Sequence, residues 1–156
     1  MIRTCALWFV AIAAVFAQDH HHQMVNEHGD KVMGFSHDKT THHFELNYDG
    51  GAIDVRNNDV RDTESRDAIR LHLRHIAQMF AEGDFSAPML VHDRKDVPGT
   101  AVMSHLKDQL HWTMSETPRG ARVTVLADNK QVLDAVHAFL RFQIEDHETG
   151  DCPMVR

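Results

Sequence analysis

Apolar and polar side chains alternate along residues 42–55 and predict a β-hairpin. The alternating apolar positions are Phe44, Leu46, Tyr48, Ile53 and Val55. A period of two places these side chains on one face of each strand, and the Asp-Gly-Gly run at 49–51 favours a tight turn between the strands. The same pattern predicts a second hairpin, with strands at residues 111–116 and 122–126.

Apolar residues at helical spacing predict two long helices, one after each hairpin. The first runs over about residues 64–81 and the second ends near residue 146. The expected N-caps are Asp62 or Thr63 and Asp128 or Asn129. A short buried strand at 89–92 and a short helix beginning near residue 102 are expected between the two units.

This order of elements predicts an α+β fold. Strands that arrive in hairpins form antiparallel sheets, and helices with one apolar stripe must cover a sheet face. We therefore expect a two-layer domain in which an antiparallel sheet carries its helices on one face. The order also suggests a doubled hairpin–helix (ββα) unit.

Residues 1–17 have the pattern of a removable export signal. Arg3 precedes an apolar run, and Val15 and Ala17 occupy the small-residue positions before a cleavage site. Cleavage after Ala17 leaves 139 of the 156 residues. A periplasmic or secreted protein is expected, with no membrane association after cleavage.

The remaining chain fits one domain. Residues 18–40 contain few apolar side chains and are expected to form a flexible, histidine-rich arm. A single α+β domain is expected at 41–150 and a C-terminal tail at 151–156. Cys5 leaves with the signal, so Cys152 has no cysteine with which to form an internal disulfide. A spare thiol, an intermolecular bridge and a soft metal ligand are the three interpretations of Cys152.

The charge balance argues against nucleic acid as a partner. Cleavage removes one of the 16 basic side chains and none of the 23 acidic ones, which leaves a net charge of −8 with neutral histidines. Such a chain repels phosphate backbones and anionic lipids.

Histidine is enriched in this chain: all 14 histidines follow Ala17, and methionine occurs 8 times in the sequence. Imidazole is the commonest metal ligand and thioether is a soft one, so the combination favours copper, with zinc or haem as alternatives. Histidine also titrates near neutral pH, so a pH-responsive surface is an equally consistent interpretation of the composition.

Two groups of residues are predicted to bind metal. Cleavage after Ala17 would make His20 the third residue, so Gln18, Asp19 and His20 would offer the planar nitrogen set that Cu(II) prefers. A solvated leader without a ligand is the alternative. In the domain, His72 and His75 are three residues apart on one helix face, and Met79 follows four residues later.

His42 shares the inward strand face with Phe44, and we expect it to converge with His72 and His75 between the first hairpin and the first helix. His92, beside Asp93, is a further candidate. Histidines bonded to backbone or carboxylate groups are the structural alternative at each of these positions.

The chain also resembles a group of small exported, histidine-rich bacterial proteins with no established function. The resemblance rests on these runs: Met33-Gly34-Phe35, Lys39-Thr40-Thr41-His42-His43-Phe44, Asp49-Gly50-Gly51, His72-Leu73-Arg74-His75-Ile76, Gly83-Asp84-Phe85, His92-Asp93 and Phe139-Leu140-Arg141-Phe142-Gln143-Ile144. It implies that the histidines belong to a shared domain design, and it implies no activity.

A metal-binding protein, rather than an enzyme, is the leading hypothesis. The sequence contains no Gly-rich phosphate loop, no Gly-x-Ser-x-Gly elbow and no Cys-x-x-Cys motif. We expect copper sequestration, delivery or tolerance, with the metal ion and another periplasmic metalloprotein as partners. The alternatives are a small metal- or haem-dependent enzyme or redox protein, and a pH-responsive binding or stress module.

Overall fold

The computed structural model describes residues 24–25 and 29–156. The predicted export signal at 1–17 and the predicted copper ligands Gln18, Asp19 and His20 lie outside the described residues. None of the helices within the described ranges is long and apolar enough to cross a membrane.

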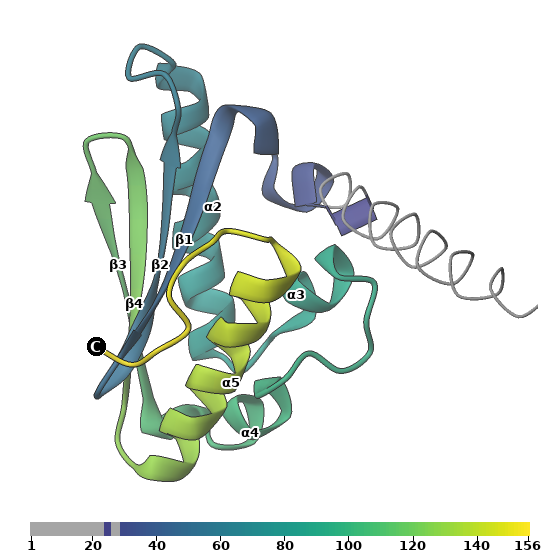
Figure 1. The fold of residues 1–156 in the computed structure, drawn as a ribbon, viewed down its shortest axis with the longest axis vertical. Coiled ribbons are helices and arrows are strands. Elements are labelled where there is room, and N and C mark those ends of the chain that lie inside the picture. Colours follow the sequence, from purple (N-terminus) through teal and green to yellow (C-terminus); the bar gives the residue numbers. More distant parts are fainter. Residues whose placement is uncertain (1–23, 26–28) are drawn as a thin grey trace, which may run out of the picture.

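Both predicted hairpins are present and form one four-stranded antiparallel sheet (Figure 1). The strands are β1 (Thr40–Asn47), β2 (Gly50–Asn57), β3 (Leu110–Thr117) and β4 (Gly120–Ala127). Their order in the sheet is β1-β2-β4-β3, so β2 and β4 join the two hairpins at its centre. The predicted α+β class is confirmed, and so are the two hairpins that the alternation of apolar and polar side chains predicted.

The two long helices begin where the capping residues predict. Asp62 accepts a hydrogen bond from the Ser65 backbone N–H at the start of α2 (Thr63–Ala81). Asn129 accepts from two backbone N–H groups at the start of α5 (Lys130–Asp146). Each cap satisfies donors that the first helical turn leaves unpaired.

Both helices cover the same face of the sheet, and each packs mainly on the hairpin of the other unit (Figure 1). Helix α2 contacts β4 and β3, whereas α5 contacts β1 and β2. Phe80 of α2 and Phe139 of α5 meet in the shared core, with ring centroids 5.9 Å apart. Because each helix packs on the hairpin of the other unit, the apolar stripes of both helices are buried in one core. Helix α5 covers the inner face of edge strand β1.

The expected strand at 89–92 is wrong, because this segment is helical. It forms α3 (Ser86–Val91), and the Asp84 carboxylate accepts from the Ser86 backbone N–H at its start. Pro88 lies in the first turn, where its missing N–H costs no helical hydrogen bond. The remaining short elements are α4 (Thr100–His105), η1 (His37–Lys39) and η2 (Lys107–Gln109).

The described part of the expected N-terminal arm is packed on the domain. Residues 29–33 are helical, and Phe35 is 6% exposed within the core. Val25 is 1% exposed. Val25 and Phe35 are therefore buried at a surface that the rest of the chain provides, whereas Met24 is exposed.

The C-terminal residues, expected to form a tail, pair with the free edge of β1. The Arg156 N–H donates to the Leu46 carbonyl, and the Tyr48 N–H donates to the Arg156 carbonyl. In Figure 1 the segment runs beside β1 to the C-terminus. It satisfies backbone groups that an edge strand otherwise exposes.

Candidate functional site

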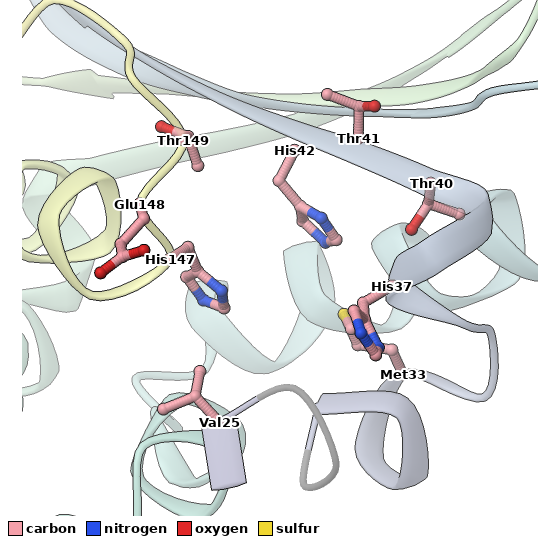
Figure 2. Close-up of a pocket in the computed structure, with 9 residues that line it drawn as sticks. All are labelled: Val25, Met33, His37, Thr40, Thr41, His42, His147, Glu148 and Thr149. Carbon is pink, nitrogen blue, oxygen red and sulfur yellow. The ribbon is translucent and has the colours of Figure 1, made fainter. Parts of the chain in front are cut away.

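A cavity of about 310 Å³ lies between the N-terminal segment, β1 and the loop that follows α5 (Figure 2). We call it the histidine pocket. Its lining consists of Val25, Met33, His37, Thr40, Thr41, His42, His147, Glu148 and Thr149. Three imidazoles from three separate parts of the chain therefore share one cavity with a thioether.

Strand alternation places His42 on this pocket, as predicted. His42 and Phe44 are two residues apart and lie on the same face, with ring centroids 6.4 Å apart. Phe35 stacks on His42 with centroids 6.2 Å apart. His147 also stacks on His42, with centroids 5.8 Å apart and an angle of 5° between the ring planes.

Burial makes His42 a neutral imidazole. Burial is the largest of the causes that lower the pKa of His42 from 6.5 to about 4, and the neighbouring rings of His72 and His43 contribute the rest. No residue in the described part of the chain makes a hydrogen bond with the His42 ring. The His42 ring is half-buried and borders the pocket, and its nitrogens are accessible from the cavity.

His147 enters the pocket because α5 ends there. It is the C-cap residue of that helix. The ring of His92 lies against it, with centroids 4.9 Å apart at 72°. His92 is itself held by Asp146, at 2.5 Å from Nδ1, and by Gln143, at 3.1 Å from Nε2.

The predicted ligand role of His92 is not supported by this geometry. Its ring is 2% exposed, and both of its nitrogens contact side-chain oxygens of α5. The expected neighbour Asp93 is not the partner, because the chain turns there with a positive φ of 48°. His92 supports His147 from within the core.

His37 and Met33 line the pocket from the N-terminal segment (Figure 2). The Asp30 carboxylate accepts from the His37 backbone N–H at 2.7 Å and lies 3.1 Å from His37 Nδ1. His37 Nε2 is 3.3 Å from the exposed carboxylate of Asp38. Both ring nitrogens of His37 therefore lie beside carboxylates, Asp30 at Nδ1 and Asp38 at Nε2.

Asp151 fixes the loop that carries Glu148 and Thr149 over the pocket. Its carboxylate accepts from the Phe44 backbone N–H at 2.9 Å and from the Thr149 hydroxyl at 2.8 Å, and it lies 2.9 Å from His43 Nδ1. Burial alone would raise the pKa of Asp151, but these hydrogen bonds lower it. The loop is thereby attached to β1.

The structure does not bring His42, His72 and His75 together as one ligand set. His72 lies edge-on to Phe35, with centroids 5.6 Å apart, and it is near enough to His42 to lower the pKa of that ring. Burial and the nearby His75 lower the pKa of His72 to about 4. His75 itself is exposed.

Helix α2 is the reason for this separation. It packs mainly on β4 and β3, and Phe35 contacts the rings of both His42 and His72. Met79 packs against the core. Within the described ranges, no group of three or more His, Cys, Asp or Glu side chains is placed to hold a metal ion.

Sequence reasoning missed Met33, His37 and His147 as pocket residues. Asp30 lies seven residues before His37, but the interpretation of 18–40 as a free arm removed any reason to pair them. His147 lies at the end of a helix, where the helix dipole already favours a histidine, so its position gives no separate signal of a pocket. Asp151, next to a turn glycine, was a usable signal for a structured loop.

Comparison with protein-family models, with curated proteins and with solved structures finds no match to this chain. The function is therefore argued from the histidine pocket itself.

Proposed function

We propose that this protein binds a transition-metal ion, copper above all, in the histidine pocket. One observation carries the proposal: the neutral His42 ring, without a hydrogen-bond partner among the described residues, faces a cavity that it shares with His37, His147 and Met33. A metal ion satisfies the nitrogen of such a ring, and only the neutral form of imidazole can bind it.

The surroundings of the pocket favour a metal ion over an organic ligand. Asp30 supports His37 as carboxylates support metal-binding histidines elsewhere. The cavity, at about 310 Å³, is at the lower end of the range of about 300–1,000 Å³ for small-molecule sites. Imidazole with thioether suits copper better than magnesium or calcium, which prefer oxygen ligands.

The proposed role is sequestration, delivery or tolerance of copper outside the cytoplasm. The export part of this proposal rests on the signal-like pattern of residues 1–17. For delivery, the partner would be another metalloprotein of the same compartment that accepts the ion from the exposed side of the pocket, where Glu148 lies.

Metal titration of the purified full-length chain tests the proposal. His20→Ala serves as the background, because it removes the predicted N-terminal site from the stoichiometry. In that background, His42→Phe should abolish about one equivalent of bound copper, since phenylalanine keeps the aromatic stack and removes the ligand nitrogen.

The matched control is His105→Phe, at an exposed position on α4. It should bind as much copper as the background protein. Equal binding by the His42→Phe and His105→Phe proteins, both folded, would refute a metal site in the histidine pocket.

A further inference from the structure

We propose that a groove beside α3 binds a small anionic amphiphile: a molecule with a carboxylate head and an apolar chain, such as a medium-chain fatty acid. The groove has a volume of about 460 Å³. Its lining includes three apolar residues, Val32, Met89 and Leu90, and three cationic ones, Lys31, Arg94 and Lys95. We call it the basic groove. Among the described residues it shares no lining residue with the histidine pocket, so the two sites are separate.

The apolar residues of the basic groove present a surface for an apolar chain. Leu90 is 62% exposed, although it belongs to α3. Val32 and Met89 are half-buried and pack against the core. A single exposed leucine is ordinary in a folded protein, but three apolar side chains on one cavity form a surface from which an apolar chain displaces water. The volume also lies within the range of about 300–1,000 Å³ for small-molecule sites.

The charges of the basic groove favour an anionic head group. Lys31, Arg94 and Lys95 line it together with one carboxylate, that of Asp93, and all four residues are exposed. Three positive charges and one negative charge give a local excess of positive charge, whereas the chain as a whole has a net charge of −7. Charges further away than a Debye length of about 8 Å are largely screened at physiological ionic strength, so a bound molecule interacts mainly with these cations.

The turn that ends α3 places Arg94 beside the apolar residues. Asp93 has a positive φ of 48°, and the Arg94 N–H donates to the Met89 carbonyl at 3.0 Å, which closes the helix end. The Arg94 guanidinium lies 5.2 Å from the centroid of the Phe142 ring, and its Nε donates to the Asp96 carbonyl at 3.2 Å. An arginine held in this way can bind a carboxylate through its remaining N–H groups, and less side-chain freedom is lost on binding.

A single amphiphile suits the basic groove better than a membrane surface. The acidic chain as a whole is repelled by an anionic bilayer, whereas one small molecule interacts only with its immediate surroundings. Met89 and Lys95 also line a neighbouring cavity of about 610 Å³. The apolar chain of a longer ligand therefore has room beyond the basic groove.

Calorimetric titration of the full-length chain with sodium decanoate, below its micelle-forming concentration, tests the proposal. At neutral pH, where the carboxylate is ionised, one equivalent should bind. The double variant Lys31→Gln, Lys95→Gln should bind about tenfold more weakly, which corresponds to the loss of two solvent-exposed ion pairs. The matched control is Lys39→Gln, Lys130→Gln, which removes two exposed lysines outside the groove and should bind decanoate as the wild type does.

The apolar part of the site has its own test. Leu90→Ala should weaken decanoate binding by about fivefold, because it removes part of the apolar surface that the chain covers. Leu71→Ala, at a 67% exposed position of α2, is the matched control and should have no effect. Octanoate, which is two CH₂ groups shorter, should bind up to about fifteenfold more weakly than decanoate. Decanol, which has the same chain and no charge, should also bind more weakly.

Each contrary result has a distinct meaning. Equal decanoate affinity in the Lys31→Gln, Lys95→Gln protein and its control, both folded, would overturn the basic groove as the site. Decanol binding as tight as decanoate binding would overturn the role of the cations. Binding to phosphatidylglycerol vesicles without saturable decanoate binding would overturn the single amphiphile in favour of a membrane surface. The His42→Phe protein should bind decanoate normally, so copper binding and decanoate binding fail or succeed independently.

Discussion

Acidification from pH 7 to pH 4.5 should strongly destabilise the metal-free protein, because two half-buried histidines must take up protons. Folding lowers the pKa of His42 and of His72 from 6.5 to about 4. Between these pH values the unfolded chain binds protons that the folded chain does not bind. Stability is therefore fully present above pH 6.5 and is lost as pH falls toward 4.

The size of the effect follows from the pKa shifts. At about 1.4 kcal/mol per pKa unit, the ceiling is about 3 kcal/mol for each ring. Both rings are only half-buried, and solvent screening reduces the contribution to about 2 kcal/mol each. A loss of about 4 kcal/mol is a large part of the about 5–15 kcal/mol that stabilises an ordinary domain.

Urea unfolding at pH 7, 6, 5 and 4.5 measures this loss in the wild type and in the double variant His42→Phe, His72→Phe. The variant should lose much less stability across the same range. The rings that face the pair, His43, His75 and His147, remain in both proteins. The lowered pKa of Asp151 contributes mainly below pH 4.5, outside the measured range. Equal pH dependence in the two proteins would refute the assignment of the loss to these buried rings.

Three further predictions concern other parts of the chain. The intact mass of the exported protein should correspond to cleavage after Ala17; retention of residues 1–17 in a membrane fraction would contradict export. A peptide beginning at Gln18 should show the visible band of square-planar Cu(II), and His20→Ala should remove it. Asp151→Ala should speed amide exchange in residues 148–156 while leaving α2 protected, because it removes the bonds that attach the loop to β1; unchanged exchange would show that Asp151 does not hold it.

The local elements of this fold were predictable because each leaves a short-range signal. Alternation in β1 and β2, the caps Asp62 and Asn129, and the apolar stripes of α2 and α5 depend on residues only a few positions apart. The exception is α3. Its apolar run is too short for periodicity to separate a helix from a strand, and the Asp84 side chain at its start decides in favour of the helix.

The candidate site was predictable only in part. Alternation alone correctly predicted that His42 faces inward, whereas the metal that the composition suggests stays a prediction. Convergence with His75 was wrong, because it assumed that a helix packs on the hairpin before it, whereas α2 lies over β4 and β3. No local pattern in the sequence indicates that each helix packs on the hairpin of the other unit, because this depends on which hairpin buries which apolar stripe.

The sequence by itself therefore determined the elements, their order and the inward direction of His42. Only the tertiary structure placed His37, Met33 and His147 around that ring. Contacts between distant parts of the chain hold this arrangement together. For example, His43 and Asp151, which are in contact, are 108 positions apart in the sequence. Such contacts form when separate apolar surfaces are buried together, and no repeat along the chain encodes the partner that each surface finds.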